Sequence, residues 1–185
     1  MRTSRSGESA LLLLDVVDGL LVRRIDYVVV GALAASIHGV VRASMDADVL
    51  LSGGMHEVKS LQVLFEKEGF STEVIRGDFE DPIPGLLTVS DPYGNRVDLL
   101  LGLRGIEPQA FTRAVEVSFQ GSTLKFVGRE DFIAMKVFAG GPMDIVDATR
   151  AICAGGDSLD VELIRRLAKG YGTAASEALE RLLAT

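Results

Sequence analysis

The sequence has one cysteine among its 185 residues and no long apolar run. That residue, Cys153, excludes an internal disulfide and a metal site built from cysteines, and we expect it to be a buried thiol on a helix. No apolar stretch reaches the roughly 18 residues that a membrane-spanning helix needs, and Asp15 and Asp18 interrupt the run at residues 10–22. The N-terminal residues lack the apolar core and cleavage site of a signal peptide. We therefore expect a cytoplasmic protein with no membrane partner.

Positive charge is also scarce. The 26 acidic residues outnumber the 19 basic residues, which gives a formal net charge of −7 at pH 7. Because non-specific affinity for nucleic acid comes from neutralised phosphates, this balance argues against a general nucleic-acid binder, although it leaves room for a local basic patch. Arg165, Arg166 and Lys169 lie close together near the C-terminus, but three cations on one helix are typical of a solvated helix face.

The most informative stretch is residues 28–51, VVVGALAASIHGVVRASMDADVLL. Asp46 and Asp48 lie one residue apart in an apolar run that reads as a strand, so both side chains point to the same face. Like charges about 4 Å apart repel by roughly 4 kcal/mol at an effective dielectric constant near 20. Such a pair requires either a protonated acid or a bound cation. The alternative is that both are ordinary acids on a solvated strand edge.

Gly31 ends the apolar strand that precedes these acids. It has no Cβ, so backbone can approach a ligand closely there. The N–H groups at the start of the following helix form a site suited to phosphate. Magnesium prefers carboxylates together with phosphate oxygens. The segment therefore predicts a site for a nucleoside triphosphate with Mg²⁺ or Mn²⁺.

This pattern resembles the nucleotidyltransferase superfamily that includes DNA polymerase beta. That family has a glycine followed by glycine or serine, then a helix, then an acid-apolar-acid-apolar strand. The matching residues are Gly31-Ala32 and Asp46-Ala47-Asp48-Val49. Ala32 departs from the pattern and removes any hydroxyl contact to phosphate, although backbone contacts remain open. The fuller run is similar to small bacterial nucleotidyltransferases of the AbiEii type, toxin-like partners in toxin–antitoxin pairs. It comprises Gly31, Ala34, His38, Gly39, Arg42, Ser44, Asp46 and Asp48.

A third acid of the family pattern would lie on a neighbouring strand, and Asp98 suits that place. It is alone among apolar residues in the segment NRVDLLL, which follows a dense turn signal at residues 91–95. An isolated acid in an apolar strand is disfavoured unless it is paired or binds metal. The alternative is a salt bridge to Arg96, which points to the same face.

Two residues between the glycine and the acids have open roles. His38, near the end of a helix of small residues, is either a hydrogen-bonded structural histidine or a base. Arg42 either binds phosphate or pairs with Asp46 or Asp48.

A second part of the resemblance lies in the C-terminal helices. Lys136, Pro142, Asp144 and Asp147 match a family pattern of a lysine on one helix and an arginine-proline-lysine-aspartate run with a further acid. Gly141 and Met143 replace the basic residues of that run. The resemblance implies that Lys136 and Asp144 help to bind nucleotide. The alternatives are a lysine whose stem covers apolar surface and an acid near a helix start.

The expected fold class is α+β, a nucleotidyltransferase-like mixed β-sheet flanked by helices with a C-terminal helical part. Residues 1–8 are expected to be disordered, residues 9–127 to form the α/β head, and residues 128–185 to form helices packed on it as one compact unit. Helices are expected over residues 9–24, 32–38 and 56–68 and from 129 onward, with breaks at 140–142 and 155–156. Strands are expected over residues 27–30, 46–51, 70–76, 86–89, 96–101, 114–119 and 123–127.

The resemblance implies a metal-dependent nucleotidyltransferase that moves a nucleoside monophosphate from a triphosphate to a hydroxyl of RNA or protein. Asp46, Asp48 and Asp98 would be the catalytic and metal-binding residues. Gly31, Ala32, Arg42, Lys136 and Asp144 would bind the nucleotide. The alternative is a catalytically inactive nucleotide-binding or interaction protein on the same fold, such as a partner of an antitoxin protein.

Overall fold

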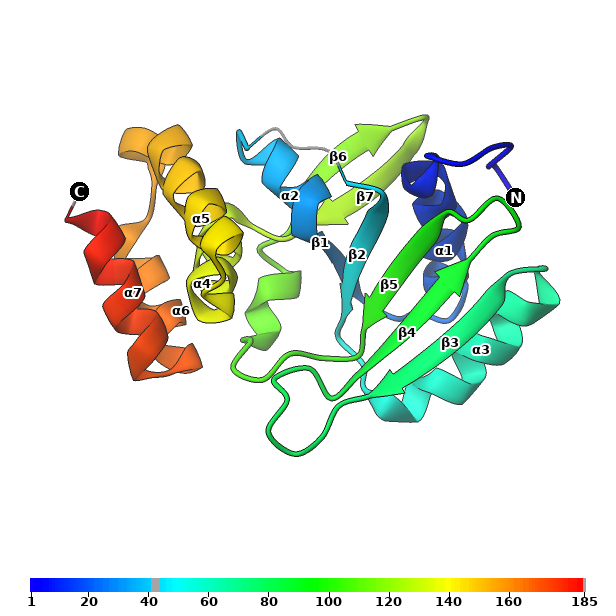
Figure 1. Ribbon diagram of the computed structural model, residues 1–185. Coiled ribbons are helices and arrows are strands. Elements are labelled where there is room, and N and C mark those ends of the chain that lie inside the picture. Colours follow the sequence, from blue (N-terminus) through cyan, green and yellow to red (C-terminus); the bar gives the residue numbers. More distant parts are fainter. Residues whose placement is uncertain (41–43, 185) are drawn as a thin grey trace. The chain divides into compact units, whose positions relative to one another are not determined.

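The structure is a computed structural model of the chain that describes residues 1–40 and 44–184 (Figure 1). The chain divides into two compact units. The first comprises Met1–Leu33, Ala43–Arg104 and Glu116–Phe126, and the second comprises Ala34–Arg42, Gly105–Val115 and Val127–Thr185. None of the described helices is long and apolar enough to cross a membrane.

A mixed β-sheet dominates the first unit. Within the described residues it has seven strands in the order β3-β4-β5-β2-β1-β7-β6. β2 and β5 are parallel, as are β1 and β7, whereas β1/β2, β3/β4 and β4/β5 are antiparallel. The strands are β1 (Tyr27–Val30), β2 (Asp46–Leu51), β3 (Ser71–Arg76), β4 (Gly85–Ser90), β5 (Arg96–Leu100), β6 (Val115–Phe119) and β7 (Ser122–Phe126).

Helices α1 (Ser9–Val22) and α3 (Val58–Lys67) lie on the same side of this sheet, behind it in Figure 1. α1 contacts β2 and β5, and α3 contacts β3. Alternation along β2 and β5 sends Ala47, Val49, Val97 and Leu99 to one face, where they are at most 1% exposed. The acids of β2 and β5 therefore point to the opposite face.

Residues 1–8 differ from the expected disordered tail, because partners far along the chain hold them. The Arg2 guanidinium donates to Asp15 at 2.8 Å, and Thr3 is buried. The backbone N–H of Glu8 donates to Asn95 Oδ1 at 2.7 Å, and Asn95 Nδ2 donates to the Arg5 carbonyl at 2.8 Å. Asn95 thereby ties the N-terminal segment to the turn that precedes β5.

The second unit is mainly a bundle around α4 (Arg129–Ala139), which contacts three further helices. Its buried face includes Phe132, Ile133 and Val137. The helices are α5 (Pro142–Gly155), α6 (Val161–Tyr171) and α7 (Thr173–Leu183). α4 ends at Gly140, which has a left-handed φ of 68°, and Pro142 then occupies the first turn of α5.

The expected fold class is confirmed: a mixed sheet flanked by helices is followed by a helical part. The helix α2 (Gly31–Ile37) and the strands β1 and β2 lie where the sequence predicted them, to within one residue. Cys153 is exposed on α5, so the expected buried thiol is wrong. The sequence placed the boundary after residue 127 and one unit boundary lies between Phe126 and Val127, but the second unit also takes in residues 34–42 and 105–115.

Candidate active site

The site is built on two parallel neighbouring strands. Asp48 of β2 and Asp98 of β5 are register partners, and Asp46 lies two residues before Asp48. Register partners on adjacent strands point to the same face, as do residues two apart on one strand. The three acids predicted to act together therefore share one face of the sheet. Asp46 and Asp48 are half-buried, and Asp98 is 7% exposed.

Gly31 lies against this face. It is the first residue of α2 and has a φ of 63°. A Cβ atom at this position would overlap Oδ2 of Asp48. The strand β1 ends at Val30, the register partner of Asp48, so the chain leaves the sheet beside that carboxylate. Ala32, which follows, is buried. Phosphate binding by Gly31 and Ala32 stays a prediction.

Asp98 is held by a two-pronged salt bridge, the alternative that the sequence left open. Arg96 Nε donates to Asp98 Oδ1 and Arg96 Nη2 donates to Oδ2, both at 2.8 Å. The Thr88 hydroxyl on β4 adds a third hydrogen bond to Oδ1 at 2.7 Å. The hydrogen bonds to Asp98 raise the pKa of Arg96, and the charges of Asp98, Asp46 and Glu73 raise it further. Arg96 is thus a cation among the acids.

The three acids fit a magnesium ion in donor type, because all three offer carboxylate oxygens on one face. Asp46 accepts a hydrogen bond from the Ser44 hydroxyl at 2.7 Å. Nowhere in residues 1–40 and 44–184 are three His, Cys, Asp or Glu side chains grouped as a ready metal site. Both oxygens of Asp98 face the Arg96 guanidinium instead. A metal ion at Asp98 would therefore compete with Arg96 for the carboxylate oxygens.

Ser9 joins the two strands that carry the acids. Its hydroxyl donates to the Met45 carbonyl at 2.6 Å and accepts from the Arg96 N–H at 3.1 Å. It thereby bridges the starts of β2 and β5. Nothing near Ser9 in the sequence signals this role, because its partners are 36 and 87 residues away. Thr88 was missed too, although a threonine between Leu87 and Val89 in an apolar strand was a usable signal.

The second unit holds Lys136 and its two acids. Lys136 Nζ lies 2.7 Å from Asp144 Oδ1 and 3.1 Å from Asp147 Oδ2. Asp147 is fully buried, and Lys136 also lies over the Phe132 ring, 5.6 Å from its centroid. Asp144 lies in the first turn of α5, where a carboxylate is favourable. The lysine is therefore more than a stem on apolar surface, and its contact with a nucleotide stays a prediction.

His38 is buried in the second unit. Its Nε2 lies 2.8 Å from the Val127 carbonyl oxygen, and its ring lies 5.4 Å from that of Phe132. Burial lowers the pKa of His38 below its usual value. This setting favours the structural histidine over the base. Arg42 lies outside the described residues, so its expected role stays a prediction.

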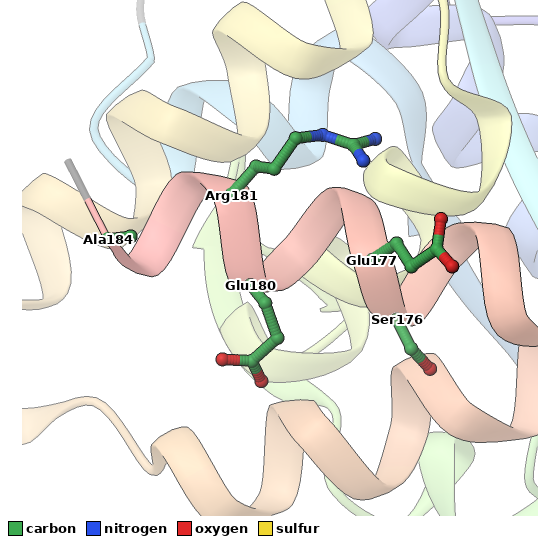
Figure 2. Close-up of a pocket in the computed structure, with 5 residues that line it drawn as sticks. All are labelled: Ser176, Glu177, Glu180, Arg181 and Ala184. Atoms are coloured by element: carbon green, nitrogen blue, oxygen red, sulfur yellow. The ribbon is translucent and has the colours of Figure 1, made fainter.

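Two hollows lie along α7. One of about 520 Å³ is lined by polar residues and Ala184, and Figure 2 shows Arg181 and Glu180 projecting from different sides of that helix. Glu180 pairs with Arg165 of α6 at 2.8 Å. The other hollow, of about 400 Å³, is mostly apolar and also reaches Arg181. Neither is lined by any predicted site residue that the structure describes.

The chain resembles solved nucleotidyltransferase structures in fold. The solution structure of the antibiotic-resistance factor ANT(2'')-Ia matches with a TM-score of 0.60 and 16% identity, over 92% of this chain and 94% of that one. The crystal structure of ANT(2'')-Ia in complex with adenylyl-2''-tobramycin matches with a TM-score of 0.58 and 15% identity, over 87% and 95%. A candidate nucleotidyltransferase from Thermotoga maritima matches with a TM-score of 0.56 and 17% identity, over 74% and 88%. No family model and no curated protein matches the chain. The fold is therefore a nucleotidyltransferase fold.

Proposed function

We propose that this protein is a metal-dependent nucleotidyltransferase that transfers a nucleoside monophosphate from a nucleoside triphosphate to an acceptor hydroxyl. One observation carries the proposal. Asp48 and Asp98 are register partners on parallel strands, and Asp46 lies on the same face, on a sheet with the fold of nucleotidyltransferases. Three carboxylates on one face of a sheet are costly without a cation, and such a set suits magnesium beside a triphosphate.

In this proposal the acids hold Mg²⁺ or Mn²⁺, and the backbone at Gly31, where β1 passes into α2, holds phosphate. A bound divalent ion would neutralise charge on the triphosphate and stabilise the oxygens that attack and leave. Asp98 takes the proton of the acceptor hydroxyl. The hydroxyl oxygen then bonds to the α-phosphorus, the bond from that phosphorus to the bridging oxygen breaks, and pyrophosphate leaves. Backbone N–H groups after Gly31 contact the phosphates, and Lys136 neutralises their charge.

The acceptor is RNA, a protein hydroxyl or a small polyhydroxylated compound. The small compound is suggested by ANT(2'')-Ia, whose structure holds adenylyl-2''-tobramycin. The net charge of −7 favours a cationic small acceptor over RNA, because an acidic surface repels phosphates. The motif run from Gly31 to Asp48 supports the AbiEii-type hypothesis, in which the chain is the toxin-like partner of an antitoxin protein.

The test uses the purified chain with each α-labelled triphosphate and Mg²⁺ or Mn²⁺, offered total RNA, cell-extract protein and tobramycin in separate reactions. We expect label in one acceptor class and none with the Asp46→Asn/Asp48→Asn double variant. A triphosphate with Mg²⁺ should also raise the melting temperature, because a ligand that binds only the folded state stabilises it. No labelled acceptor together with no thermal shift at millimolar ligand would rule the proposal out.

A second candidate function is nucleotide binding without turnover. The observation that favours it is the salt bridge of Arg96 to both oxygens of Asp98, since an acid so engaged is a poor base. Thermal stabilisation by triphosphate and metal, with no label in any acceptor, would support this candidate. Label in any acceptor would exclude it.

A further inference from the structure

We infer that Arg96 is a built-in counter-ion that competes with a divalent metal ion for Asp98, so that the site accepts the ion fully only when the guanidinium releases that carboxylate. The inference rests on the proposed function. It assigns Arg96 a regulatory role, that of holding the site closed to metal.

The competition follows from how Asp98 is used. Its Oδ1 accepts from both Arg96 Nε and the Thr88 hydroxyl, and its Oδ2 accepts from Arg96 Nη2. A carboxylate has about four lone-pair sites, so three are taken. A divalent ion bound to either oxygen would lie beside the guanidinium, and two cations so close repel. Arg96 and the ion therefore compete for this carboxylate.

Arg96 is placed so that it can leave. Its side chain is 46% exposed, whereas the side chain of Asp98 is 10% exposed. Asp46 is the register partner of Arg96 across β2 and β5. Glu73 stands in one row of the sheet with Thr88 and Asp98 and is exposed. Asp46 and Glu73 both act on Arg96 by their charges, so a released guanidinium has other carboxylates close by.

This arrangement changes what the acid pair on β2 implies. The sequence predicts that clustered carboxylates need a cation, and the fold supplies one from the chain itself. The metal-free protein consequently avoids much of the repulsion among its acids. Entry of a metal ion then exchanges one cation for another.

The test measures Mn²⁺ affinity by titration calorimetry without nucleotide in the parent, Arg96→Gln and Arg96→Lys. Glutamine removes the charge, and we expect about tenfold tighter Mn²⁺ binding, as for a site that is about 90% closed in the parent. Lysine retains a point charge without the two-pronged geometry and should give a smaller tightening. Arg76→Gln is the matched control, because it removes the same charge from exposed β3 and should leave Mn²⁺ affinity unchanged.

A melting curve for each variant guards against a folding defect. Without metal, Arg96→Gln should melt below the parent, and Mn²⁺ should raise its melting temperature more than it raises that of the parent. The double variant Arg96→Gln/Asp98→Asn should lose this extra gain. If Arg96→Gln does not fold, the tightening in Arg96→Lys decides the question.

Equal Mn²⁺ affinity in the parent and the Arg96 variants, with Mn²⁺–triphosphate still binding, would overturn the competition and leave the proposed function standing. No Mn²⁺ binding to any variant, with or without triphosphate, would overturn both.

Discussion

Gly31 at the start of α2 packs directly against the carboxylate of Asp48 on β2, so closely that a Cβ atom on Gly31 would overlap Oδ2. The backbone of Gly31 is also left-handed, with a φ of 63°. Two independent requirements therefore demand glycine here, one for the backbone conformation and one for the space beside an acid of the candidate site.

Replacement of Gly31 by alanine should cost more stability than its backbone conformation alone explains. A left-handed φ costs a residue with a Cβ about 1–2 kcal/mol, and the overlap with Asp48 adds to this because the carboxylate must move. Gly121→Ala is the matched control, since Gly121 has a φ of 79° with nothing within 4 Å of its Cβ position. Urea unfolding should show a larger loss for Gly31→Ala. Equal losses would mean that the contact with Asp48 carries no energy.

Neutralisation of the three acids should divide them into two classes. Asp46→Asn and Asp48→Asn should abolish nucleotidyl transfer and change the stability of the metal-free fold little, because Arg96 already offsets much of the repulsion among the acids. Asp98→Asn should instead cost about 1–3 kcal/mol, because it weakens charge-assisted hydrogen bonds from Arg96 and Thr88 to a buried carboxylate. Thermal and urea unfolding measure both. Severe destabilisation by Asp46→Asn and Asp48→Asn would instead show that these acids are structural salt-bridge partners.

Local pattern was enough to predict the strands that carry these acids, whereas the pairing of β2 with β5 was expected only from the family resemblance. Apolar runs bounded by glycine and turn residues identified β1, β2 and β5, and the period of two placed Asp46 and Asp48 on one face. The same reasoning left two roles open for Asp98, metal binding or a salt bridge to Arg96, and the structure shows the salt bridge. Arg96 lies two positions before Asp98 on one strand, so the sequence itself offers this pairing.

Long-range polar contacts could not be predicted in this way. Ser9 bonds to Met45 and Arg96, and Asn95 bonds to Arg5 and Glu8, across gaps that no periodicity spans. These bonds order residues 1–8, which polarity alone marked as disordered. Cys153 was expected to be buried because cysteine is on average among the most buried residue types, yet it lies on the exposed side of α5.

Lys136 should be needed for the stability of the second unit, and not only for any phosphate contact. It lies between Asp144 and the fully buried Asp147, so Lys136→Met removes a cation from beside a buried acid. Loss of one partner of a buried pair costs about 3–5 kcal/mol. Urea unfolding of Lys136→Met, Asp147→Asn and the double variant should show strong coupling, with the double variant more stable than Lys136→Met. Lys169→Met, at an exposed position on α6, is the control for charge loss.

If the Lys136→Met loss matched that of Lys169→Met, the lysine would be free for a purely ligand-directed role. In that case its triphosphate affinity, and not its melting temperature, would reveal its function.

His38 should make the protein less stable in mild acid. Burial lowers the pKa of its imidazole, so the unfolded chain, with an ordinary pKa near 6.5, binds the proton more readily than the folded chain. Stability therefore rises with pH between the lowered pKa and about 6.5, and it falls as pH drops through that window.

Carboxylates titrate near this range too, so the parent must be compared with His38→Gln, whose amide can still donate to the Val127 carbonyl. The urea midpoint of the parent should fall more between pH 7.5 and pH 5 than that of His38→Gln. The same pH dependence in the parent and His38→Gln would show that the buried imidazole is protonated as easily in the fold as outside it.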